Sequence, residues 1–117
     1  MIAETAIIMG TAMARKQPNG QAPRSAAALA VSNLSGKHRK TLDAIFARPD
    51  KSNISWSSFV GLMEALGADV ITEGGSAHDF RLFGDFVNIH RPHPGHELYK
   101  PYVRAIRSFL KRVGVTP

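Results

Sequence analysis

Residues 67–90 read GADVITEGGSAHDFRLFGDFVNIH, and their pattern predicts a small antiparallel sheet. Gly67 ends an apolar pattern of helical period, and short apolar runs that suit strands follow it. Turn residues separate these runs at Gly74-Gly75 and at Gly84-Asp85, where glycine accepts the positive φ that tight hairpin turns require. We therefore expect three strands, at about residues 68–73, 77–83 and 86–90.

A two-residue turn at Gly84-Asp85 predicts the pairing of the second hairpin. It sets Phe83 opposite Phe86, Leu82 opposite Val87, Arg81 opposite Asn88, Phe80 opposite Ile89 and Asp79 opposite His90. Successive strand residues point to opposite faces, so the core side receives Phe80, Leu82, Val87 and Ile89. The other side receives Ala77, Asp79, Arg81, Asn88 and His90, whereas His78 points inward at the sheet margin.

Three helices are expected around these strands. Leu42, Ile45 and Phe46 predict a helix over residues 37–47, which Arg48-Pro49 ends. Ser55 can cap a second helix that carries Trp56, Phe59, Val60, Met63 and Leu66 on one face, and Gly67 closes it. A third helix covers residues 101–113, with Arg104, Arg107, Lys111 and Arg112 mostly opposite its apolar face. The order predicts an α+β fold, with helices on one face of a three-stranded antiparallel sheet.

The composition of the chain changes near residue 35. Residues 1–35 are rich in Ala, Ser, Gly, Pro, Gln and Asn and contain no aromatic residue, so we expect a disordered low-complexity leader. Its alanines allow a short helix over residues 25–31, although an isolated helix of that length is marginal in water. An upstream start that the cell does not use is one origin for such a leader, and a docking tail is the alternative. The folded domain is expected over residues 36–117.

Charge and composition limit the classes of function. The formal net charge is +6, which favours RNA, acidic proteins or anionic surfaces as partners. The chain has no cysteine, which excludes disulfides, Cys-based zinc sites and thiol nucleophiles. The early apolar run at residues 6–9 is too short for an export signal, and no segment is long and apolar enough to span a bilayer. We therefore expect a soluble protein of the cytoplasm.

Several segments resemble the HicA toxin family. They are Gly75-Ser76-Ala77-His78-Asp79-Phe80, Pro92-His93-Pro94, Glu97-Leu98 and the closing Leu110-Lys111-Arg112-Val113-Gly114. The resemblance covers about the last two-thirds of the chain. It implies a fold like a double-stranded-RNA-binding domain and an mRNA interferase that needs no metal or other cofactor. It also implies a HicB-like antitoxin that covers the active face.

The chain departs from the family pattern at one important position. Typical members carry the functional histidine directly after the Gly-Ser pair, whereas here Ala77 stands first and His78 second. His78 is therefore either the displaced active residue or a half-buried structural residue. Tyr99 is an extra residue in the segment after Glu97-Leu98, which indicates a divergent subgroup.

The chemistry of RNA cleavage supplies its own candidates. Without a metal, it needs a base for the 2′-hydroxyl, an acid for the leaving oxygen and cations for the phosphate, and histidine suits the first two tasks. His90 is the candidate base or acid, oriented by Asp79 across the strands, and His93 is its candidate partner. Arg81 and Arg91 are expected to hold the phosphate. The alternative is that His90 closes a strand and that Arg81 and Asp79 form an ordinary surface charge pattern.

Weaker signals complete the set. Ser76, in the Gly74-Gly75-Ser76 turn, could bind a phosphate, and so could Arg104, Arg107 and Lys111 of the last helix, although such a basic face is often simply solvated. His90, His93 and His96 form a weak zinc pattern. Phe83 and Phe86 could stack on an unpaired base. Three hypotheses follow: an endonuclease toxin, an RNA-binding module without catalysis, and a protein whose free sheet face binds an antitoxin.

Overall fold

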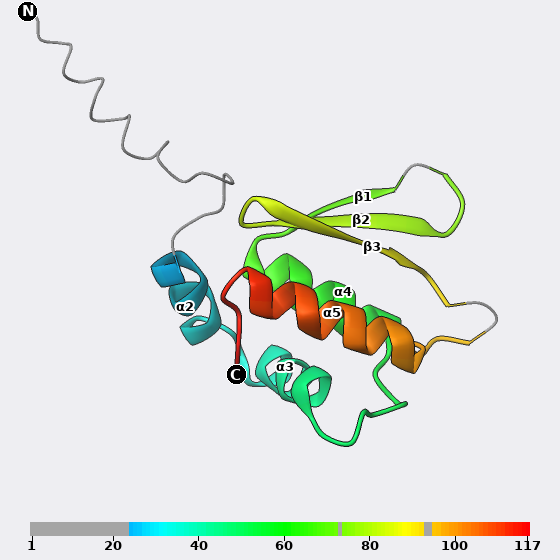
Figure 1. Cartoon of the computed structure of the whole chain (residues 1–117), viewed down its shortest axis with the longest axis horizontal. Coiled ribbons are helices and arrows are strands. Elements are labelled where there is room, and N and C mark those ends of the chain that lie inside the picture. Colours follow the sequence, from blue (N-terminus) through cyan, green and yellow to red (C-terminus); the bar gives the residue numbers. More distant parts are fainter. Residues whose placement is uncertain (1–23, 73, 93–94) are drawn as a thin grey trace, which may run out of the picture.

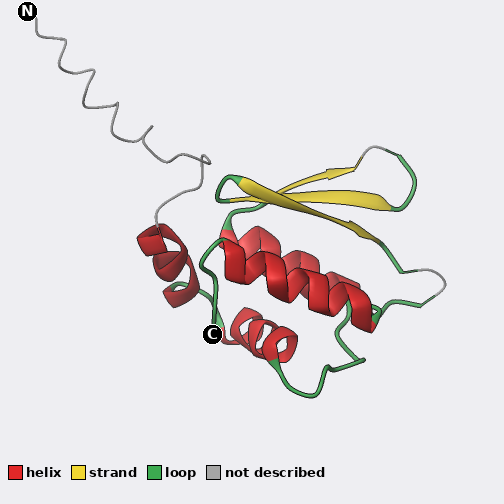
Figure 2. Cartoon of the chain, in the orientation of Figure 1, coloured by secondary structure: helices red, strands yellow, loops and turns green. Residues whose placement is uncertain are grey.

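The computed structural model describes residues 24–72, 74–92 and 95–117 and has an α+β fold. Its elements are α2 (Arg24–Ser32), α3 (Gly36–Phe46), α4 (Trp56–Leu66), β1 (Asp69–Thr72), β2 (Ala77–Leu82), β3 (Asp85–His90) and α5 (Lys100–Arg112). The strands form one antiparallel sheet in the order β1-β2-β3. α4 and α5 lie against one face of this sheet, and α3 packs on their far side (Figures 1 and 2). The predicted fold class is confirmed.

The caps predicted from the sequence fix both ends of α4. Ser55 is the N-cap, and its hydroxyl accepts a hydrogen bond from the backbone N–H of Ser58 at 3.1 Å. Gly67 ends the helix with φ +100°, the left-handed conformation that glycine adopts without a steric penalty. Phe59, Leu62 and Met63 are fully buried between these caps, so α4 presents its apolar side to the core.

The second hairpin turns one residue earlier than predicted. Leu82 pairs with Asp85, so Phe83 and Gly84 form the turn, with φ of +49° and +82°. The predicted partners were therefore wrong, but the faces were right, because partners shift by two residues and side chains alternate with a period of two. Asp85 gains two contacts at this position: it accepts a bond from the N–H of Phe86 at 2.7 Å and one from Arg112 Nε at 2.9 Å.

The core lies between the sheet and the helices. Phe80 and Ile89 supply it from the strands, and Phe59 and Phe109 supply it from the helices, all at most 1% exposed. The Phe59 and Phe80 rings pack at 4.7 Å between centroids and join α4 to β2. This packing leaves the opposite face of the sheet, which we call the outer face, without a helix in the part of the chain that the structure describes.

The end of the segment expected as a leader is folded against the domain. α2 buries Ala27 and Val31, and Leu34 follows them into the core. Arg39 of α3 donates a hydrogen bond to the carbonyl of Val31 at 2.8 Å. The helix that the alanines allowed is therefore present and gains the tertiary partners that a short helix requires. Residues 1–23 of the expected leader lie outside the described residues, and the domain boundary near residue 36 stays a prediction.

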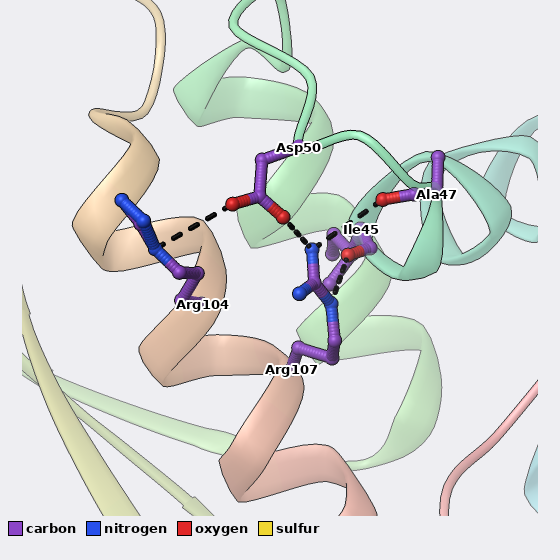
Figure 3. Close-up of polar contacts among 5 residues, drawn as sticks. All are labelled: Ile45, Ala47, Asp50, Arg104 and Arg107. Atoms are coloured by element: carbon purple, nitrogen blue, oxygen red, sulfur yellow. Dashed lines mark hydrogen bonds and ion pairs between the residues drawn. The ribbon is translucent and has the colours of Figure 1, made fainter.

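Arg107 lies in the interior, which corrects the prediction that it belongs to an exposed basic face. Its side chain is 5% exposed and joins α5 to the C-terminal end of α3. Its Nε donates to the carbonyl of Ile45 at 2.9 Å, while Nη2 contacts the Ala47 carbonyl at 3.5 Å and Asp50 at 2.5 Å. Figure 3 shows these contacts between the three elements of the chain. Carbonyls at the end of a helix have no hydrogen-bond donor within the helix. Arg107 donates to two carbonyls at the end of α3, those of Ile45 and Ala47.

Candidate active site

The outer face of the β2–β3 hairpin carries a row of cross-strand pairs, each with at least one polar or charged side chain. The backbone N–H of Arg91 bonds to the carbonyl of Ser76 at 2.8 Å, which makes Ala77 and His90 the next, non-hydrogen-bonded pair. The same geometry recurs two residues along at Asp79 and Asn88, and again at Arg81 and Phe86. Side chains of such pairs lie close together, with Cβ atoms about 4.5–5.5 Å apart.

His90 is exposed at the open end of this row, at the C-terminus of β3. Its Nδ1 lies 3.4 Å from the hydroxyl oxygen of Ser76, and the small side chain of Ala77 stands opposite it. The prediction that Asp79 lies opposite His90 was wrong, because the turn at Phe83-Gly84 moves the pairing by two residues. Ser76 is therefore the residue that contacts the His90 ring.

Asp79 belongs to a separate polar group in the middle of the hairpin. Its two carboxylate oxygens accept hydrogen bonds from Asn88 Nδ2 at 2.9 Å and from Arg81 Nη2 at 3.4 Å. Arg81 is 56% exposed and lies four residues along the strand from the Ala77–His90 pair, about 14 Å at the rise of an antiparallel strand. The structure thus does not bring Arg81 beside His90, as the prediction of a shared phosphate site required.

His78 points toward the helices, as predicted. Its ring packs edge-on against Trp56 of α4 at 5.1 Å between centroids and lies 6.4 Å from the ring of Phe80. Its Nδ1 lies 2.8 Å from the carbonyl oxygen of Ser76. Two histidines therefore meet at Ser76, His78 at the backbone carbonyl and His90 at the hydroxyl.

Two contacts of the histidines were not predicted from the sequence, that of Trp56 with His78 and that of Ser76 with His90. The helical pattern assigned Trp56 to the core, which is correct, since it is 7% exposed. Its contact with His78 depends on how α4 crosses β2, and no sequence spacing reports that crossing. Ser76 was predicted to bind phosphate, and its contact with His90 follows from the observed strand register.

The remaining candidates are dispersed. Arg91 is exposed and adjoins His90 in the chain. Arg104 is 52% exposed and lies 3.5 Å from Asp50, whereas Lys111 is exposed near the other end of α5. Neither is on the outer face, because α5 packs beneath the sheet (Figure 1). His93 lies outside the described residues, so its predicted role and the zinc pattern with His90 and His96 remain untested.

Comparisons with known proteins supply one match. The family described as HicA toxin of bacterial toxin-antitoxin matches residues 56–115, from the start of α4 to just beyond α5. No curated protein and no solved structure matches the chain. In the described part of the chain, none of the helices has the length and apolar character that crossing a membrane requires.

Proposed function

The chain belongs to the HicA toxin family of bacterial toxin–antitoxin pairs, and we propose that it is an mRNA endonuclease that uses histidine acid–base chemistry without a metal. The observation that carries this proposal is the position of His90. Its ring lies on the exposed outer face, against Ser76 and opposite Ala77.

The strand pairing explains how His90 can act where the family pattern has lost its histidine. The resemblance places the functional histidine directly after Gly75-Ser76, where this chain has Ala77. Ala77 and His90 are cross-strand neighbours on the same face, and their Cβ atoms are about 5 Å apart in such a pair. An imidazole carried by β3 therefore reaches the space that a histidine at position 77 would occupy, and the methyl group of Ala77 leaves that space open.

The proposed reaction is an attack by RNA on its own backbone. His90 accepts the proton of a 2′-hydroxyl, whose oxygen then bonds to the adjacent phosphorus. The bond from phosphorus to the 5′-oxygen breaks, and that oxygen takes a proton from an acid. The products are a 2′,3′-cyclic phosphate and a 5′-hydroxyl. His93, three residues further along the chain, is the proposed acid.

The other site residues take supporting roles in this proposal. The Ser76 hydroxyl orients the His90 ring, and His78 is a positioning residue that holds the Ser76 carbonyl from the core side. The exposed Arg91 offsets charge on the reacting phosphate. Arg81, about 14 Å along the hairpin, contacts the RNA backbone away from the reacting bond.

The test is cleavage of a purified mRNA in EDTA by the wild-type chain and by His90→Ala. We expect the variant to lose about 10²–10⁴-fold in rate, the usual contribution of a general acid or base. His96→Ala is the matched control, because it removes an exposed histidine of the neighbouring loop that is off the strands, and it should cut normally. Cleavage by His90→Ala at the wild-type rate would refute the assignment. A wild-type chain that binds RNA without cutting it would leave the alternative, a non-catalytic RNA-binding module, which Ala77 favours.

A toxin of this family requires a neutralising partner, and we propose a HicB-like antitoxin that covers the outer face. Phe86 supports this surface, because it is 57% exposed there and pairs with Arg81. Since mRNA is the proposed target, we place the action of the chain in the cytoplasm. Co-expression with the product of a neighbouring reading frame tests the partner: Phe86→Ala should weaken the complex, and an unchanged complex would contradict the use of this face.

A further inference from the structure

A cationic groove lies between α3 and the first turn of α4, away from the outer face. It consists of two hollows of about 280 and 260 Å³ that share Thr41 and Ser58. The first is lined by Lys40, Thr41, Ala44, Lys51, Asn53, Ile54, Ser55 and Ser58, and the second by Lys37, His38, Thr41, Ser57, Ser58 and Gly61. No carboxylate is among these lining residues, so the positive charge of the groove is not offset within it.

The lysines of the groove differ from four arginines elsewhere in the described part of the chain. Arg81, Arg104, Arg107 and Arg112 each form an ion pair with an aspartate. Lys37, Lys40 and Lys51 are exposed, and none of them pairs with a carboxylate among the described residues. Lys37 and Lys40 are three residues apart on α3, so their side chains leave the same side of that helix. The groove therefore gathers cations that the protein itself does not neutralise.

Hydroxyl groups complete the lining on the α4 side. The Ser55 hydroxyl accepts from the backbone N–H of Ser58 and donates to the Ser58 hydroxyl oxygen at 2.8 Å. This leaves the Ser58 O–H free to donate in another direction. Thr41, on the opposite wall, donates its hydroxyl proton to the carbonyl of Lys37 at 3.3 Å, so it offers no further donor to the groove. The lysine ammonium groups of α3 and the Ser58 hydroxyl of α4 thus line the groove together, a donor set that phosphate oxygens accept.

His38 adds a buried ring nitrogen beside the lysines of the groove. Its Nδ1 is buried and has no hydrogen-bond partner among the described residues. Gly61 allows the ring to lie there, because a Cβ at that position would come within 3.1 Å of His38 Cε1. Buried polar atoms are normally hydrogen-bonded, and this ring nitrogen beside the groove is one that the described residues leave unsatisfied.

We propose that this groove binds consecutive phosphates of the RNA strand that is cut at His90. The inference rests on the proposed function and deepens it by assigning a second, backbone-binding site. Trp56, which adjoins Ser57 and Ser58 in the chain, packs on His78, and its N–H bonds to the carbonyl of His96. The groove therefore begins at the end of α4 that carries Trp56, whose ring contacts His78 beside the active site. In this proposal, one RNA strand passes from the groove, around the helix layer, to His90. α3 precedes the matched residues 56–115, so the groove depends on residues outside the family match.

RNA fits the groove better than an acidic protein does. Stable protein interfaces have an apolar, often aromatic, centre, whereas the exposed large hydrophobic residues of the described chain are Leu29, Phe86 and Tyr99, and none of them lines the groove. A polar, cationic channel without an apolar centre is typical of contacts to a sugar–phosphate backbone, which fix position and carry no sequence information.

The experiment measures how binding of a 2′-O-methyl RNA strand depends on salt, because that strand cannot be cut and reports binding alone. Each phosphate neutralised on a single strand contributes about 0.7 to the slope of log K against log salt. Lys37→Gln/Lys40→Gln should lower the slope by about 1.4. Arg48→Gln/Lys100→Gln is the control, since it removes the same charge from exposed positions outside the groove and should change the slope less. Both pairs are on the surface, and thermal melting checks that each variant is folded.

Three results would overturn the proposal: equal slopes for the two double variants, no binding of the RNA by the wild-type chain, or binding of polyglutamate that depends equally on Lys37 and Lys40. Inorganic phosphate at matched ionic strength separates the sources of the anion. If it displaces the RNA at millimolar concentration, the groove binds isolated anions and not a strand. Failure of the proposed function is distinguishable, because a chain that binds through the groove but never cuts mRNA refutes the nuclease and leaves the groove in place.

Discussion

Replacing Arg107 with methionine should destabilise the fold more than any exposed arginine replacement. The guanidinium is 5% exposed and joins α5 to the end of α3 through the carbonyls of Ile45 and Ala47 and the carboxylate of Asp50 (Figure 3). Methionine keeps much of the length of the side chain and its apolar contacts but offers no donor. The substitution therefore isolates the loss of these hydrogen bonds.

The magnitude follows from the acceptors that lose their donor. A buried acceptor without a partner costs about 1–3 kcal/mol, and the short bond to Ile45 belongs to this class, whereas the contact to Ala47 at 3.5 Å is weaker. We expect a total loss of about 3 kcal/mol in the free energy of unfolding. At about 4–8 °C per kcal/mol for a domain of this size, Tm should fall by about 12–24 °C.

Urea unfolding and thermal melting measure this effect, with Arg104→Met as the matched control. Arg104 is on the same helix and contacts the same aspartate, but its side chain is 52% exposed. An exposed ion pair contributes about 0–1 kcal/mol, so the control should melt close to the wild type. Equal stability of Arg107→Met and Arg104→Met would refute the reasoning that Arg107 satisfies buried carbonyls.

Three further predictions concern Asp85, the N-terminal residues and Gly61. A hydrogen bond from Arg112, aided by the N–H of Phe86, holds the pKa of Asp85 below its ordinary value of 3.8. The contribution of Asp85 to stability is therefore present above about pH 4 and is lost as the pH falls through the lowered pKa. Urea midpoints below about pH 4 should fall less steeply in Asp85→Asn than in the wild type, and identical profiles would contradict this. Deleting residues 1–34 should lower the free energy of unfolding in urea by at least about 2 kcal/mol, because it removes the buried Ala27, Val31 and Leu34. Deleting residues 1–23 should leave the described contacts intact. Equal midpoints for the two shortened chains would show that α2 does not stabilise the domain. Gly61→Ala should lower Tm, because its Cβ would meet His38 Cε1 at 3.1 Å, and His38→Ala in the same chain should restore part of the loss; additive losses would contradict a clash.

Local sequence signals predicted most of the elements. Ser55 and Gly67 act at the two ends of α4 through bonds and dihedral angles that involve only their near neighbours in the chain, so their roles were visible in the sequence. The alternation of Phe80, Leu82, Val87 and Ile89 predicted which sheet face is buried. The burial of Phe80, Leu82 and Ile89 confirms it. The free face with Asp79, Arg81, Asn88 and His90 followed from the same alternation.

The candidate site was predicted only in part, because its contacts depend on register. Two turns, at Phe83-Gly84 and at Gly84-Asp85, satisfy the same alternation, since they differ by two residues in pairing. In the observed register, α5 contributes Arg112 to Asp85, a contact between residues 27 positions apart. That register replaces the predicted Asp79–His90 pair with Ala77–His90 and brings Ser76 to the His90 ring.

The sequence by itself therefore determined the order of the elements, their caps and the faces of the strands, because these depend on periodicity and on short-range geometry. The tertiary structure decided which residues meet: Ser76 with both histidines, α2 with the core, and Arg107 with the end of α3. An arginine on a helix has the same local pattern whether it faces water or three acceptors of another element. The burial of Arg107 was settled when α3 and α5 packed together, because the carbonyls that α3 leaves without partners accept hydrogen bonds from that guanidinium.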